Sequence, residues 1–227
     1  MRRAIADHMS KARATIPHGQ TVMEADITRL VTWREREKVA FQAREGANLT
    51  LTVFFVAALG RALRRVASDL EVPPPIRSGS TTIDLGIAVA LDGGLIVPVV
   101  RNADRLSFGE AARTIQDLAD RARAGRLAPD ETTGAVMSVT NVGTFGNITA
   151  FPIVPLNQVG ILGPGIVEQR PLPSGDGGIR LGWRCLLALV FDRRALSDFA
   201  ADRLLSTVVE ELGTPLTPAL SPHGERE

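Results

Sequence analysis

Few residues of this sequence could exchange a proton near neutral pH. It contains three histidines and one cysteine: His8, His18, His223 and Cys185. Imidazole is the most frequent general base in enzymes, and a thiolate is a strong nucleophile, so these side chains are the first candidates for chemistry. Cys185 lies in an apolar run, however, which favours a small core residue over a nucleophile.

Polar residues follow two other apolar runs. Thr140 ends one of them, and its plainest interpretation is a hydroxyl that bonds to the backbone. The segment 192–198 (DRRALSD) ends the other. Arginine stays protonated at physiological pH, so neither Arg193 nor Arg194 can act as a base. An ion pair is the simpler role for both, and above all for Arg194. Ser197 and Asp198 are typical of a helix start.

Composition excludes several classes of function. A formal net charge of +1 gives no cationic excess for nucleic acid. The single cysteine rules out an intrachain disulfide and suits a reducing compartment. No apolar run is long enough for a membrane span, and the N-terminus lacks a signal-peptide core. We therefore expect a cytoplasmic protein that binds neither nucleic acid nor membrane.

The elements that must position these residues can be read from periodicity and breakers. Helices are expected over 4–15, 27–44 (with Asp26 as N-cap), 50–67, 107–124 and 198–212, and strands over 20–25, 82–90, 95–101, 135–141, 159–166 and 181–191. A hairpin-type turn at 92–94 and uneven strand spacing do not suit a regular doubly wound sheet. The pattern favours an α/β sandwich built on a mixed sheet.

Loops and the C-terminus complete this organisation. Three prolines make 71–80 a loop, and 213–227 has the composition of a disordered tail. Gly143 and Gly146 are spaced as in a phosphate loop, but no Gly-Lys-Ser/Thr follows, so a tight turn is expected. The arginines of 121–126 could meet phosphates, although a solvated helix end is the simpler interpretation.

Five stretches in the same order resemble the catalytic core of the dihydrolipoamide acyltransferases of 2-oxoacid dehydrogenase complexes. They lie at 2–6 with Met9 and 17–18, at 24–30, at 86–104, at 138–146 and at 161–163. The resemblance spans residues 1–212, which are expected to form one core domain. It implies the fold of chloramphenicol acetyltransferase, a CoA-dependent acyltransferase, and acyl transfer between dihydrolipoamide and coenzyme A as substrate, without a metal.

The resemblance also implies an assembly. Family cores form homotrimers with active sites between subunits, and the trimers build cubic or dodecahedral cages. Lipoyl and subunit-binding domains usually precede the core. Because this sequence starts at the core, the lipoyl group is expected from another domain or chain.

Within the resemblance, Thr140 occupies the position of the hydroxyl that stabilises the oxyanion. The family's base is the histidine of an Asp-His-Arg-x-x-Asp-Gly run. In this sequence Arg193 replaces that histidine, Ser197 the aspartate and Asp198 the glycine. His18 matches a histidine that relatives carry in addition, so it is no obvious replacement for the base.

The consequence for activity can be bounded. A general base contributes about 10²–10⁴-fold, and a few per cent of a free thiol is ionised at pH 7. We therefore expect an acyltransferase of impaired activity. The alternative is a catalytically silent scaffold subunit, a pseudoenzyme that keeps the trimer or cage beside an active paralogue. Pro155, in place of a family asparagine, and the 71–80 loop are further departures that bear on the substrate channel.

Overall fold

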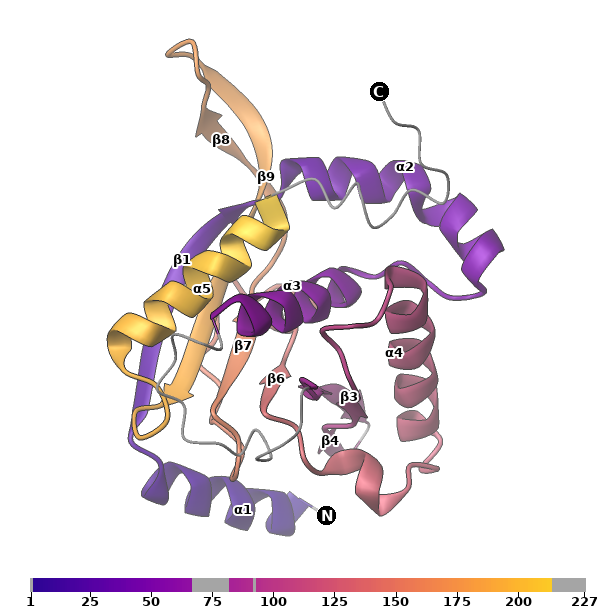
Figure 1. Cartoon of the computed structure of the whole chain (residues 1–227), viewed down its shortest axis with the longest axis vertical. Helices are drawn as coiled ribbons and strands as arrows, with labels where there is room; N and C mark the ends of the chain where they lie inside the picture. Colours follow the sequence, from indigo (N-terminus) through magenta and orange to yellow (C-terminus); the bar gives the residue numbers. More distant parts are fainter. Residues whose placement is uncertain (1, 67–81, 92, 214–227) are drawn as a thin grey trace.

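A mixed sheet is the frame of this computed structural model, which describes residues 2–66, 82–91 and 93–213 (Figure 1). Its strands run in the order β1 (His18–Asp26), β9 (Ile179–Asp192), β7 (Gly160–Pro164), β6 (Met137–Val139), β2 (Leu85–Ile87) and β5 (Val99–Val100). β6 pairs in parallel with both β2 and β7, whereas β9 runs antiparallel to β1 and β7. The expected mixed α/β architecture is confirmed.

Three further strands lie off this path. β8 (Glu168–Pro173) pairs with β9, and the two form a hairpin that projects from the body (Figure 1). β3 (Val89–Leu91) and β4 (Gly94–Ile96) form a separate two-stranded sheet. The two strands expected over 82–90 and 95–101 are therefore each divided. Ala88 separates β2 from β3, and its N–H donates to the carbonyl of Val139 (2.9 Å).

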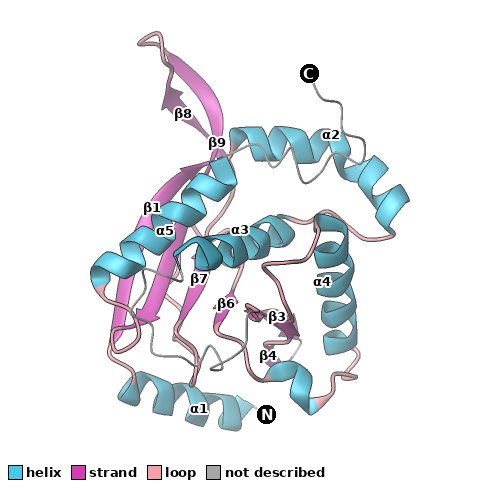
Figure 2. Cartoon of the chain, in the orientation of Figure 1, coloured by secondary structure: helices cyan, strands magenta, loops and turns pink. Residues whose placement is uncertain are grey.

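Helices cover both faces of this sheet. They are α1 (Arg2–Thr15), α2 (Thr28–Glu45), α3 (Leu51–Val66), α4 (Phe108–Arg123) and α5 (Asp198–Gly213), with short 3-10 turns at Pro129–Thr132 and Val142–Phe145. α1 lies on one face and the others lie on the opposite face. α3 is buried along almost its whole length and packs beside α5 (Figure 2). Within the described ranges, no helix is both long and apolar enough to cross a membrane.

The two faces of β9 feed two different apolar clusters. Leu187, Leu189 and Phe191 belong to the main core under α3 and α5. Val190 points to the other face, where it joins a small cluster of residues from α1, β7 and the loop before β7: Ala12, Ile16, Val154 and Ile161. Side chains alternate along a strand, so one strand anchors both layers.

Some local expectations were wrong. α2 begins at Thr28 with Ile27 as N-cap, whereas Asp26 is the last residue of β1, and its carboxylate accepts from the N–H (3.1 Å) and the hydroxyl of Thr28. β8 was not expected at all. The loop at 71–80, one residue of the predicted 92–94 turn and the tail from 214 onward lie outside the described residues.

Candidate functional site

Thr140 lies directly after β6, in the middle of the sheet. Its backbone N–H donates to the carbonyl of Leu162 (2.9 Å), which fixes the residue at the end of the strand. Its hydroxyl makes no hydrogen bond within the described part of the chain, so it does not form the backbone bond of the simpler interpretation. The hydroxyl of Thr140 is therefore available to an external acceptor.

The turn after Thr140 is held by unusually close backbone packing. A Cβ on Gly143 would come within 2.1 Å of the carbonyl oxygen of Gly165, so only glycine fits there. Gly146 ends the turn in the left-handed conformation with φ of 83°, which glycine adopts without strain. The expectation of a tight turn at this glycine pair is confirmed.

A cleft of about 710 Å³ opens beside this turn. Asn141, Thr144 and Phe145 form one wall, and the other walls come from the start of α3, from β3 and from α4. Its lining mixes aliphatic and polar side chains, and Arg34, Arg123 and Asp120 belong to it. Arg34 pairs with Glu35 and Arg123 with Asp120, so acidic neighbours partly neutralise both arginines.

Arg193 lies in the tight turn between β9 and α5. Its backbone N–H donates to Pro17 O (3.0 Å), and its Nη2 lies 2.9 Å from Asp198 Oδ1. Ser197 precedes the helix, and its hydroxyl oxygen accepts from the N–H of Ala200 (3.1 Å). The interpretation of Ser197 and Asp198 as the start of the last helix is confirmed, since α5 begins at Asp198.

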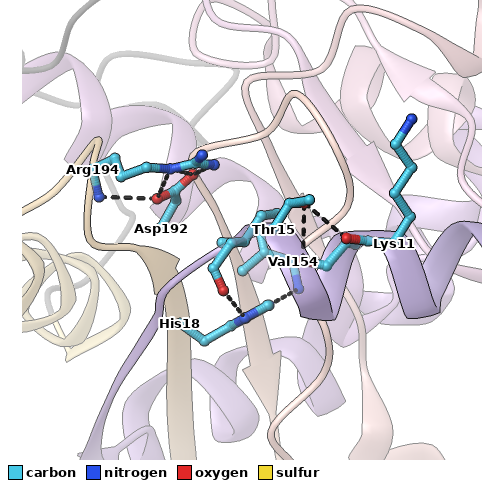
Figure 3. A network of polar contacts seen from close by, with 8 residues as sticks. Lys11, Thr15, His18, Val154, Asp192 and Arg194 are labelled. Atoms are coloured by element: carbon cyan, nitrogen blue, oxygen red, sulfur yellow. Dashed lines mark hydrogen bonds and ion pairs between the residues drawn. The ribbon is translucent and has the colours of Figure 1, made fainter.

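Asp192 and Arg194 form a clamp across this turn (Figure 3). The Asp192 carboxylate accepts from Nε (2.9 Å), Nη2 (2.6 Å) and the backbone N–H (2.9 Å) of Arg194. Burial by itself opposes ionisation of Asp192, but these bonds outweigh it and hold the pKa of Asp192 below its ordinary value. The expected ion-pair role of Arg194 is confirmed.

The two histidines that the structure describes, His8 and His18, offer no replacement base. Nδ1 of His18 lies 2.8 Å from Ile16 O, and Nε2 accepts from the N–H of Val154 (3.1 Å), so both ring nitrogens are engaged (Figure 3). His8 is exposed on α1, and His223 lies outside the described residues.

The structure does not bring Thr140 and Arg193 together within one chain. Sheet register places Thr140 level with Ala188 of β9, because Val139 pairs with Leu162 and Leu162 with Leu189. Five further residues lead from Ala188 to Arg193, which is roughly 17 Å along a strand. Arg193 therefore lies beyond the end of β9, whereas Thr140 lies level with its middle.

Other candidates take structural roles. Cys185 is 1% exposed, and burial raises the pKa of its thiol to about 12, with only a weak opposing effect from its hydrogen bond to Gly165 O. Arg121 makes a two-pronged pair with Glu131 (2.6 and 2.7 Å) rather than ending in solvent. Arg123 pairs with Asp120 (3.1 Å) at the cleft.

Three features of the site were not predicted. They are the cleft, the clamp between Asp192 and Arg194, and the two bonds of His18. The residues of the clamp stand two apart in the sequence, but an Asp-x-Arg pair is too common to indicate a clamp. The cleft joins segments more than 100 residues apart, so only the fold reveals it.

The chain was then compared with known proteins. The family model described as "2-oxoacid dehydrogenases acyltransferase (catalytic domain)" matches residues 1–220. The lipoamide acyltransferase component of the branched-chain alpha-keto acid dehydrogenase complex of Bacillus subtilis is 33% identical over 219 residues, which are 93% of this chain and 50% of that protein. The chain thus spans about half the length of this relative.

Solved structures show the same fold. A probable dihydrolipoamide acetyltransferase from Listeria monocytogenes superposes with a TM-score of 0.88 at 31% identity, covering 97% of this chain and 95% of the other. The dihydrolipoamide acetyltransferase of Azotobacter vinelandii, in which a serine, a histidine and an asparagine were investigated for their catalytic roles, gives 0.85 at 26%, covering 93% and 88%.

Two more solved structures bear on assembly and topology. The cubic core of a pyruvate dehydrogenase multienzyme complex gives a TM-score of 0.85 at 26% identity over 93% of this chain and 88% of the other. Chloramphenicol acetyltransferase gives 0.53 at 16% over 91% and 94%, which shows a shared fold alone. The expected chloramphenicol acetyltransferase-like architecture is confirmed.

Proposed function

We propose a function for this chain, which belongs to the 2-oxoacid dehydrogenase acyltransferase family and matches its catalytic domain. The proposed reaction is the transfer of an acyl group between dihydrolipoamide and coenzyme A, at a rate limited by a missing base. The observation that carries the proposal is the free hydroxyl of Thr140 at the end of β6, beside the cleft.

In this reaction a thiolate of one substrate attacks the thioester carbonyl of the other. The oxygen becomes an oxyanion, the tetrahedral intermediate collapses, and the second thiolate leaves. Thr140 would donate a hydrogen bond from its hydroxyl to that oxyanion. Removal of one such donor typically lowers kcat by about 10²–10³-fold. The aliphatic side chains and the two arginines in the lining of the cleft support binding of a thiol with apolar and anionic parts, such as coenzyme A.

The attacking thiol must also lose its proton. Arg193 cannot accept it, because a guanidinium is protonated throughout the physiological range. His18 is no substitute while the N–H of Val154 occupies its acceptor nitrogen. Only thiol that ionises unaided would then react, and this lowers the rate at neutral pH.

A second candidate function is that of a catalytically silent scaffold. The pairing of Arg193 with Asp198 and the helix cap of Ser197 favour it, because all three residues at altered motif positions have structural roles of their own. Such a subunit would keep the trimer or cage, beside an active paralogue that performs the chemistry.

A homotrimer is part of both candidates. The separation of Thr140 from position 193 supports an active site that needs residues of two subunits, and the likeness to a cubic core supports a higher assembly. The lipoyl group would come from another domain or another chain. The solitary buried Cys185 supports a reducing compartment, so we place the protein in the cytoplasm.

Turnover of acetyl-CoA with dihydrolipoamide tests the proposal, with the Bacillus subtilis lipoamide acyltransferase and its preferred acyl-CoA as the active reference. We expect turnover above the uncatalysed rate but at or below about a hundredth of the reference, the loss typical of a missing general base. A rate indistinguishable from background with acetyl-, propionyl-, isobutyryl- and succinyl-CoA would favour the scaffold. Sizing at micromolar concentration should give a trimer or larger, and a monomer would contradict both candidates.

A further inference from the structure

His18 is the first residue of β1, where it faces Asp192 in the register of β1 with β9. One ring nitrogen lies 2.8 Å from Ile16 O, which can only accept a hydrogen bond. The other lies 3.1 Å from the N–H of Val154, which can only donate. These partners require a neutral ring with its hydrogen on Nδ1, since a protonated ring has no acceptor.

The ring connects two segments that are distant in sequence. Ile16 follows α1, and Val154 lies in the loop that leads to β7. Both side chains are buried in the small apolar cluster under α1, at 5% and 0% exposure. Apolar packing is not directional, whereas the two hydrogen bonds of His18 fix how α1 and this loop sit on the sheet.

Residues 16–18 also contact the turn that carries position 193. Pro17, between Ile16 and His18, accepts from the N–H of Arg193 through its carbonyl (3.0 Å). The neighbouring clamp of Asp192 and Arg194 faces the histidine across the β1–β9 pairing (Figure 3). Movement of residues 16–18 would therefore shift the backbone at position 193.

We propose that His18 is a positioning residue for position 193, acting by a neutral-ring clamp that joins α1, the loop at Val154 and the 192–194 turn into one unit. Its importance for catalysis rests on the proposed function, in which position 193 is where the base of the family belongs. The mechanical coupling does not depend on that function.

Hydrogen exchange of the full chain, followed by mass spectrometry at pH 7.5, tests the coupling. His18→Leu removes both ring bonds, whereas His18→Gln keeps a side-chain amide with an acceptor oxygen that can face the N–H of Val154. His8→Gln is the matched control, because His8 is an exposed histidine on α1. Peptides over 3–16, 150–158 and 190–197 report the clamp, and a peptide over 51–66 reports global folding.

His18→Leu should raise the exchange rate of all three clamp peptides by at least tenfold and leave the 51–66 peptide protected. His18→Gln should give exchange rates between those of His18→Leu and the unmodified chain. Unchanged exchange at 190–197, while α1 exchanges faster, would overturn the proposal. If His18→Leu does not fold, the Gln variant decides: exchange at 190–197 at least threefold above that of the unmodified chain supports the clamp, and exchange below that level contradicts it.

A second arm uses the Arg193→His variant. There, His18→Gln should lower kcat at least threefold and leave the KM for acetyl-CoA within twofold, and an unchanged kcat would contradict the positioning role. If Arg193→His gains no activity, the proposed function fails, while the exchange result still decides whether the clamp exists.

Discussion

Arg193 Nη2 lies 2.9 Å from Asp198 Oδ1, so two residues that both depart from the family motif contact each other. Their side chains are 53% and 62% exposed, and exposed ion pairs contribute about 0–1 kcal/mol. A double-mutant cycle of Arg193→Ala and Asp198→Ala, measured by urea unfolding, should therefore give a coupling free energy below about 1 kcal/mol. The histidine could then be restored at little cost to the fold. A coupling above about 2 kcal/mol would show that the pair is a main support of the turn.

Ser197 caps α5 through its bond from Ala200 (3.1 Å). Ser197→Ala should lower the free energy of unfolding by about 1 kcal/mol, because the N–H of the third helical residue loses its acceptor. Ser197→Asp keeps an acceptor and places a negative charge at the helix start, so its stability should stay within about 0.5 kcal/mol of the unmodified chain. Equal losses in both variants, from urea midpoints, would contradict the capping role.

Asp192 links stability to pH. Its folded-state pKa is lowered, because the bonds from Arg194 outweigh the effect of burial. The unfolded chain therefore binds this proton more readily, so the stabilisation is complete above the unfolded aspartate pKa of about 3.9 and is lost as pH falls through the lower folded value. Asp192→Asn should make the free energy of unfolding depend less on pH below about pH 4. At pH 7 it should lower this free energy by only about 1 kcal/mol, because Arg194 is exposed. An unchanged slope below pH 4 would show that other carboxylates cause it.

Cys185 should be inert in the folded protein. Burial raises the pKa of its thiol to about 12, which leaves roughly one thiolate in 10⁴ at pH 8. Ellman's reagent at pH 8 should detect no thiol within minutes in the folded chain and one thiol after denaturation in urea. Rapid titration of the folded chain would mean that β9 opens readily or that the thiol is accessible.

Sequence patterns predicted the local features that depend on residues adjacent in the sequence. The strand before Thr140, the turn at Gly143 and the helix start at Ser197 all follow from local periodicity and capping, and all three were found, although the strand is Met137–Val139 rather than 135–141. β8 escaped prediction because Pro171 and Pro173 argue against a strand, yet they are tolerated where only one neighbour, β9, pairs with it.

Long-range contacts account for what could not be predicted. At the break between β2 and β3, the N–H of Ala88 donates to a carbonyl of β6 that is 51 residues away. The bond between His18 and Val154 spans 136 residues, so no spacing rule could reveal it. The separation of Thr140 from Arg193 likewise follows from sheet register, which the order of the strands alone does not determine.

We propose that this chain retains the fold and the oxyanion donor Thr140 but lacks the proton acceptor at position 193. The most direct test of this claim is kcat/KM for acyl transfer from acetyl-CoA to dihydrolipoamide in the unmodified chain and in Arg193→His combined with Ser197→Asp. We predict a gain of about 10²-fold or more at pH 7.5, of which Thr140→Val in the same background removes about 10²-fold. Equal kcat/KM in the double variant and the unmodified chain would contradict the claim.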